Sequence, residues 1–267
     1  MKEGVFYKHF ARDPYFNMAF DEWMFARACK NESKIFLRLY SWNRGAITFG
    51  FNQKAESALD YNKLNNTPVI RRITGGRALF HEPSELTYSV TVNSNPDTFD
   101  FLGDSISKAS SIIARVLIDF LSKLGVRSHY MLQSSKENSA PDFFHKAPCF
   151  ASHAKYEIVT NGQKIIASAQ RRIGKTVFQH GSIKINGTAS HPALPLGGAN
   201  YLSPRELRRI ENDEFNEAAV LFVQSFENFL NVSFNLENEN GQFNKELKER
   251  ILYVKKNSFL KRNIFKQ

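Results

Sequence analysis

The dipeptide Asn161-Gly162 constrains the fold of this chain more than any other feature. It stands between two segments of strand-like composition, 156–160 and 164–169. Asn-Gly is favoured where both central residues of a two-residue turn need positive φ, and such turns join antiparallel strands. The segment therefore predicts a β-hairpin.

The rest of the chain mixes strand and helix patterns. Further strands are predicted at 35–40, 46–51, 69–72, 85–92 and 176–185, with a turn at 42–45 joining the first two. Apolar residues at helical spacing predict helices over 13–28, 104–124 and 214–230, and Asn17 is the expected N-cap of the first. The charged tail, 244–267, is expected to end in a helix. We therefore expect an α+β fold with a mostly antiparallel or mixed sheet packed by helices. It would be a single domain over 1–267, with no accessory C-terminal domain.

The composition narrows the class of protein. Of the 267 residues 42% are hydrophobic, which is enough for a sizeable core. No apolar run reaches the roughly 18 residues of a membrane span, and the N-terminus lacks the apolar core of a secretory signal. Cys29 and Cys149 are too few for a disulfide framework, and Cys29 is expected to act as a small apolar residue at a helix end. We expect a cytoplasmic protein, not bound to a membrane, in which a free thiol survives.

The formal net charge of +10 fits either a solvated basic surface or an acidic partner drawn in by the long-range field. Basic residues are spread along the chain and cluster only at 255–256 and 261–262, with no nucleic-acid motif beside them. An acidic protein domain fits the charge as well as nucleic acid does. Nucleic-acid binding is the weaker hypothesis, and we expect none.

The segment 71–81 carries a candidate binding loop. Two glycines within Thr74-Gly75-Gly76-Arg77 allow positive φ and a close approach of the backbone to a ligand. Exposed N–H groups in such a turn hold an oxyanion or a carbonyl oxygen. Arg71 and Arg72, with Arg77, would add charge for a phosphate-bearing substrate, and His81 follows the loop.

Cys149 is the candidate nucleophile, because a thiol with a lowered pKa attacks acyl groups. Lys164 stands just after the Asn-Gly turn and before an apolar pair, so its cation is the best candidate to lower that pKa. His180 is a candidate substrate contact or proton carrier, with a hydrogen-bonded core histidine as the alternative. The histidines show no metal-ligand spacing, so no metal is expected, and the sequence has no phosphate-binding P-loop and no dinucleotide fingerprint.

Motifs along nearly the whole chain resemble the biotin/lipoate protein ligase superfamily. The sequence motifs are most similar to those of the cysteine-dependent octanoyltransferases. The matching segments are DPYFNMAFDE, LRLYSWNRGAITFGFNQ, RRITGGRALFHEPSELTYSV, APCFASHAKYEIVTNGQKIIASAQRR and VFQHGSIKI.

The resemblance implies roles for particular residues. Cys149 matches the family nucleophile, and Lys164 matches the lysine thought to lower the pKa of that thiol. The substrate pocket would use the loop Arg72–Arg77. Further expected substrate-binding residues are Arg71, His81, Ser168, Ala169, His180 and Gly181. Ala167 stands where the family usually has glycine.

The implied activity is octanoyl transfer from acyl carrier protein to a lysine of a lipoyl domain or of the glycine cleavage H protein. A Cys149 thioester would be the intermediate, without a cofactor. The segment 133–147 is expected to be a polar loop that orders on substrate binding.

Alternative functions stay open at this stage. An ATP-dependent lipoate–protein ligase would use Lys164 and the arginine loop, with Mg²⁺, and would not need Cys149. An amidotransferase would move octanoyl between protein lysines through the same thiol. A non-catalytic acyl-binding or regulatory module is the alternative from a different class.

Overall fold

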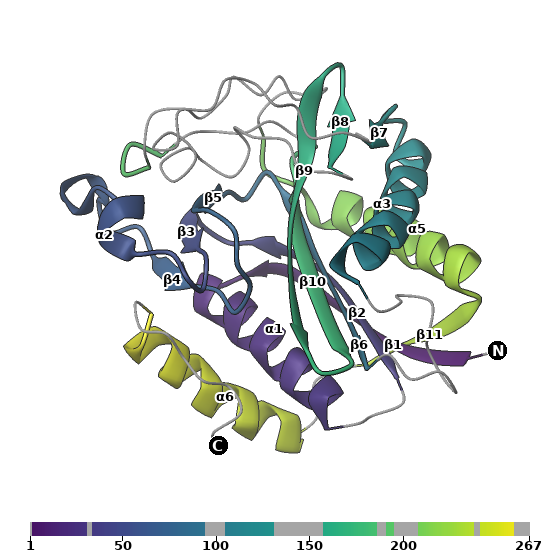
Figure 1. Ribbon diagram of the computed structural model, residues 1–267, viewed down its shortest axis with the longest axis horizontal. Coiled ribbons are helices and arrows are strands. Elements are labelled where there is room, and N and C mark those ends of the chain that lie inside the picture. Colours follow the sequence, from purple (N-terminus) through teal and green to yellow (C-terminus); the bar gives the residue numbers. More distant parts are fainter. Residues whose placement is uncertain are drawn as a thin grey trace.

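The computed structural model describes residues 2–30, 34–93, 105–130, 157–185, 191–194, 208–237 and 241–258. The predicted nucleophile Cys149 and the predicted loop 133–147 lie outside the described residues. Those residues carry both layers of helices and the sheet between them (Figure 1).

The main sheet has eight strands in the order β11-β1-β2-β6-β10-β9-β8-β7. Strand β1 runs parallel to β2 and β11, and the other neighbours are antiparallel, so the expected mixed sheet of an α+β fold is confirmed. Its strands are β1 (Lys2–Arg12), β2 (Ile35–Trp42), β6 (Leu86–Asn93), β7 (His129–Tyr130), β8 (Ile158–Thr160), β9 (Gln163–Ile173), β10 (Thr176–Ile183) and β11 (Val232–Leu236).

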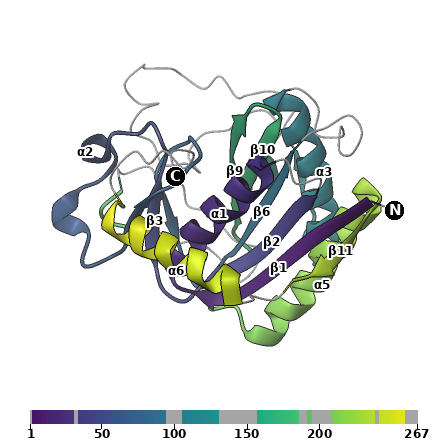
Figure 2. The same ribbon diagram turned by 90° about the horizontal axis from the view of Figure 1, so that it is seen from below.

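Helices cover both faces of this sheet. Helix α1 (Pro14–Cys29) and helix α6 (Gly241–Lys256) lie on one face, and α3 (Ile106–Lys123) and α5 (Asn212–Leu230) on the other (Figure 2). Side chains alternate along a strand. In β6, Leu86, Tyr88, Val90 and Val92 therefore join the core under α3 and α5. The polar residues between them face α1, and Ser89 bonds to a carboxylate of that helix.

A smaller sheet, in the order β4-β3-β5, stands beside α1. It consists of β3 (Ala46–Phe49), β4 (Val69–Arg71) and β5 (Leu79–His81), with the short helix α2 (Ala55–Ala58) and a 3-10 turn (Tyr61–Lys63) between β3 and β4. The predicted turn after β2 is present, but β2 and β3 belong to different sheets. Loop 72–77 joins β4 to β5 and lies between the two sheets.

The predicted hairpin is confirmed. Asn161 and Gly162 have φ of 48° and 73°, as the turn requires. Ile158 pairs with Ile166 but Val159 pairs with Lys164, so Ile165 is an extra residue that forms a bulge in β9. Among the described strands, β8 pairs with β9 only as far as Ile166, whereas β10 follows β9 to its end.

Two local predictions need correction. Asp13, and not Asn17, caps α1: its carboxylate accepts from the Tyr15 N–H at 2.9 Å, and Pro14 occupies the first helical position. Asn17 is buried one turn further on. The long strand β1 was not predicted from the sequence, although it pairs with two neighbours.

Candidate functional site

Six predicted substrate-binding residues line one narrow cavity between the two sheets. They are Arg72, His81, Ser168, Ala169, His180 and Gly181. The cavity has a volume of about 20 Å³, and Met18, Tyr40 and Thr48 complete part of its wall. The residues come from β5, β9, β10 and the start of loop 72–77, which are far apart in the sequence. The fold therefore brings the separate motifs together.

His180 is held by a buried carboxylate. Its Nδ1 lies 3.0 Å from Asp21 Oδ2 of α1, and its Nε2 lies 2.7 Å from the Thr74 hydroxyl. Arg38 Nη1 donates to the other oxygen of Asp21 at 2.8 Å. Burial lowers the pKa of His180 below its ordinary value, although Asp21 opposes the shift. The neutral ring therefore donates from Nδ1 and accepts the Thr74 hydroxyl at Nε2.

His81 is held in the same way on the other side of the cavity. Its Nδ1 lies 2.6 Å from Glu85 Oε1, and its Nε2 lies 2.8 Å from the Thr48 hydroxyl. Lys184 donates to the other Glu85 oxygen, and the Trp42 ring stacks on His81 at 4.1 Å. Burial again lowers the pKa of the histidine. Two chains of the same type, cation–carboxylate–histidine–threonine, thus flank one cavity and fix both rings.

Loop 72–77 is fastened by Arg72. Its guanidinium donates to the carbonyl of Gly75 at 2.9 Å and to that of Arg77 at 2.7 Å. Gly76 has φ of 87°, and a Cβ there would lie 2.8 Å from Arg72 Nη2. A side chain there would be strained by the positive φ, and it would displace the Arg72 guanidinium that holds the loop. The second predicted glycine is therefore needed for the shape of the loop.

Arg71 lies away from the cavity. Its Nη1 donates to the carbonyls of Phe51 and Gln53, at 3.0 and 2.6 Å, and its guanidinium covers the Phe49 ring. Both Arg71 and Arg72 thus direct donors to backbone oxygens. The roles of Arg71, Thr74, Gly75, Gly76 and Arg77 in substrate binding remain predictions, as do those of the six residues that line the cavity.

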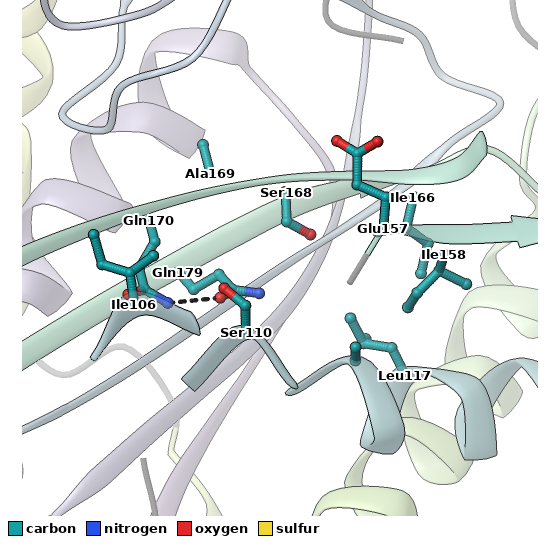
Figure 3. A pocket seen from close by; sticks show the side chains of 11 residues that line it. Ile106, Ser110, Leu117, Glu157, Ile158, Ile166, Ser168, Ala169, Gln170 and Gln179 are labelled. Carbon is teal, nitrogen blue, oxygen red and sulfur yellow. Dashed lines mark hydrogen bonds between the residues drawn. The ribbon is translucent and has the colours of Figure 1, made fainter. Parts of the chain in front are cut away.

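Lys164 is buried, with 3% of its surface exposed. Its ammonium donates to Glu157 Oε1 at 2.5 Å. Glu157 in turn lines a second cavity, of about 210 Å³, which lies between β9 and α3 (Figure 3). The side chains of Ser168 and Ala169 point to opposite faces of β9, and both residues contribute to both cavities.

The sequence did not single out Asp21 and Glu85 as site residues. Both are buried, with 1% and 0% of their surface exposed. A usable signal was present for Asp21: a carboxylate among the apolar residues of an amphipathic helix needs a buried partner. Glu85 offered less, because it follows another glutamate in a polar turn.

No described helix combines the length and the apolar character needed to cross a bilayer. In the same part of the chain, no three His, Cys, Asp or Glu side chains gather as a metal-ligand set. Cys29 is half-buried at the end of α1, and burial raises the pKa of its thiol.

The segment that carries the candidate site is similar in sequence to known proteins. A family model described as the lipoyl protein ligase A/B catalytic domain matches residues 13–198. The octanoyltransferase LipM of Clostridioides difficile is 36% identical over 172 residues, which cover 62% of this chain and 60% of that protein. The LipM of Staphylococcus epidermidis is 32% identical over 179 residues, covering 65% and 62%. The match thus spans about three fifths of the length of these relatives.

Solved structures agree on the fold. A bi-partite lipoate protein ligase from Thermoplasma acidophilum has a TM-score of 0.71 at 15% identity, covering 98% of this chain and 99% of that one. A lipoate-protein ligase A bound with ATP also has a TM-score of 0.71, at 17% identity and 94% coverage of both chains. Because the family model spans well over half of the sequence, the chain belongs to the lipoyl protein ligase A/B catalytic domain family.

Proposed function

We propose that this protein is an octanoyltransferase. It moves octanoyl from acyl carrier protein to a lysine of a lipoyl domain or of the glycine cleavage H protein. The similarity to LipM octanoyltransferases supports this proposal. The observation that carries it is the gathering of Arg72, His81, Ala169 and His180 around one cavity. Of these, Ala169 lies on β9, the strand that also carries Lys164.

The transfer runs in two steps. The Cys149 thiolate attacks the thioester carbonyl of the donor; a new carbon–sulfur bond forms, the old one breaks, and the donor thiolate leaves and takes up a proton. The acceptor lysine, as the free amine, then attacks the Cys149 thioester. An amide forms, the amine proton is lost, and the Cys149 thiol is released. Octanoyl ends on the acceptor, and the enzyme returns to its starting state.

Cys29 is the poorer candidate for the nucleophile. Its thiol has a pKa raised by burial, so it is poorly ionised at neutral pH. A cytoplasmic setting is part of the proposal, since the catalytic thiol must stay reduced. The charge of +10 suits acidic carrier proteins as donor and acceptor.

Lys164 would assist from the strand end. Its ammonium, held by Glu157, would favour the thiolate of Cys149 or the oxyanion of the tetrahedral intermediate. Backbone N–H groups of loop 72–77 are the second candidate for that oxyanion. No cofactor is needed by this chemistry.

The ATP-dependent ligase is less well supported. It needs cations for a triphosphate, but Arg71 and Arg72 direct guanidinium donors to the carbonyls of residues 50, 51, 53, 75 and 77. Redirecting them would release the two segments that they hold, residues 50–53 and loop 72–77. The geometry therefore favours a donor that is already activated as a thioester.

Intact mass spectrometry tests the proposal. The purified protein is mixed with octanoyl–acyl carrier protein without ATP, and we expect one octanoyl adduct that hydroxylamine removes. Cys149→Ala should form none, whereas the matched control Cys29→Ala should still form it. Acylation that appears only with ATP and free octanoate would assign the protein to the ligases and refute the proposal.

A further inference from the structure

The second cavity is a groove between α3 and β9 (Figure 3). Along β9 it extends from Ile166 to Gln170, and along α3 from Ile106 to Leu117. Four steps of extended strand cover about 13 Å, and eleven steps of helix rise about 16 Å. The groove is therefore roughly 13–16 Å long.

The two ends of the groove differ in polarity. Ile158, Ile166 and Leu117 form an apolar end, which also holds Glu157, the partner of Lys164. The other end presents the amides of Gln170 and Gln179 beside the side chain of Ile106, with Ser110 and Ser168 in between. Beyond Gln170 the same face of β9 continues to Arg172, whose Nη2 donates to the Ser105 carbonyl of the α3 cap. A ligand that fits this order is apolar near Lys164, then carries hydrogen-bonding groups, and ends near a cation.

The amides form a fixed row. Gln170 Nε2 donates to Gln179 Oε1 at 2.9 Å, and Gln179 Nε2 donates to the Tyr88 hydroxyl at 2.7 Å. That hydroxyl also bonds to Ser168 Oγ at 2.9 Å. Gln170 Oε1 is buried and has no hydrogen-bond partner within the described part of the chain. An unmet buried acceptor is costly, so this oxygen favours a ligand that supplies an N–H.

An octanoyl chain does not match this groove. Three bonds of an extended chain cover about 3.8 Å, so an octanoyl chain reaches only about 9 Å. Its tail would also end beside amides that it cannot bond. A pantetheine arm has about twelve bonds from its sulfur to its terminal oxygen, or about 15 Å on the same measure. It begins with an apolar thioethyl unit, continues with two amides, and ends at a phosphate in its protein-bound form.

We propose that the groove between α3 and β9 binds the pantetheine arm of the thioester donor. The sulfur lies at the end with Glu157, and the amides lie along Ser110, Ser168 and Gln170. The acyl chain crosses the edge of β9 at Ser168 and Ala169, the residues that line both cavities, toward His81 and His180. This inference rests on the proposed function, because only a thioester donor brings such an arm.

Two synthetic thioesters test it. S-octanoyl pantetheine carries the amides, whereas the S-ethyl thioester of octanoic acid has none. We expect wild-type protein to prefer the first in kcat/KM for acylation. Gln170→Leu should lower kcat/KM for the pantetheine thioester about tenfold, which is the value of one ligand hydrogen bond, and should reduce the preference by a similar factor. Ser110→Leu, which fills the groove from α3, should act in the same direction.

The controls separate the outcomes. Gln224→Leu makes the same substitution at an exposed position of α5, and it should keep the wild-type preference; melting curves check that each variant is folded. If Gln170→Leu lowers kcat/KM equally with octanoyl–coenzyme A and with octanoyl–acyl carrier protein, the result supports the pantetheine arm as the ligand. A loss confined to the carrier protein would overturn the inference in favour of a carrier surface.

Two further results are decisive. If wild-type protein is acylated but uses both synthetic thioesters equally, or if the groove variants lower both to the same extent, the groove does not bind the arm. If wild-type protein is acylated by none of the donors, the octanoyltransferase proposal itself fails.

Discussion

Glu85 should make the stability of this protein depend on acid in a calculable way. Burial raises the pKa of this carboxyl, but Lys184 and His81 lower it by a larger amount. The pKa therefore falls from an ordinary value of 4.5 to about 2. A lowered carboxyl pKa stabilises the fold above pH 4.5, and that stabilisation is lost as the pH falls toward 2. The full shift corresponds to about 3 kcal/mol. Of this, about 1.4 kcal/mol should be lost by pH 3.5.

The test compares Glu85→Gln with wild type by urea unfolding at pH 7, 5, 4 and 3.5. At pH 7 the variant should lose about 3 kcal/mol of unfolding free energy, because Lys184 stays buried with one carboxylate fewer. The difference should narrow by about 1.4 kcal/mol at pH 3.5, as wild type loses its advantage. Glu217→Gln, at an exposed position of α5, should show no such trend. A difference for Glu85→Gln that stays constant with pH would refute the electrostatic account.

Other substitutions probe the same region. Asp21→Asn should cost about 3–5 kcal/mol of unfolding free energy, since Arg38 is left buried without its ion pair, whereas Asp119→Asn at a half-exposed pair should cost under about 1 kcal/mol in the same urea assay. Burial lowers the pKa of His180 in the folded protein, so the unfolded chain binds a proton at this histidine first as the pH falls below about 6.5, and the folded state loses stability. His180→Gln should therefore make the decline of unfolding free energy below pH 6.5 less steep. Gly76→Ala should lower the melting temperature and should also lower kcat/KM for the proposed octanoyl transfer several-fold. Gly125→Ala, which has a similar φ but open space around its Cβ, should lower the melting temperature only.

Local patterns in the sequence predicted the elements that depend on local physics. The Asn161-Gly162 turn gave the β8–β9 hairpin, and the apolar spacing over 104–124 gave α3, which ends before Gly125 at a φ of 78°. Strand β1 was missed, because neither partner is joined to it by a hairpin: β2 follows only after helix α1, and β11 lies near the other end of the chain. Asn17 was taken as the cap because asparagine is a favoured capping residue. Its actual partners, Arg38 and Ser41, are tertiary contacts that the local sequence does not show.

The candidate site shows the same division. Glycine and histidine motifs pointed to the loop and to His81 and His180, and the fold places them at one cavity. The carboxylates that hold the histidines were not found, since Asp21 and His180 are 159 positions apart. Only the packing of α1 on β10 brings them within 3.0 Å. Sequence spacing carries no information about such a contact.

The turn at Asn161-Gly162 also determines how one strand serves two cavities. Ala169 points toward the narrow cavity with the histidines, whereas Ser168 and Gln170 point into the groove under α3. A shift of one residue in strand register exchanges the two faces. The turn sets the pairing of β8 with β9, and the extra residue at Ile165 then sets which face each later side chain occupies. Deleting Ile165 would therefore move every side chain from Ile166 onward to the opposite face of β9, relative to Lys164. This change should disrupt both cavities, although Ile165 itself lines neither of them.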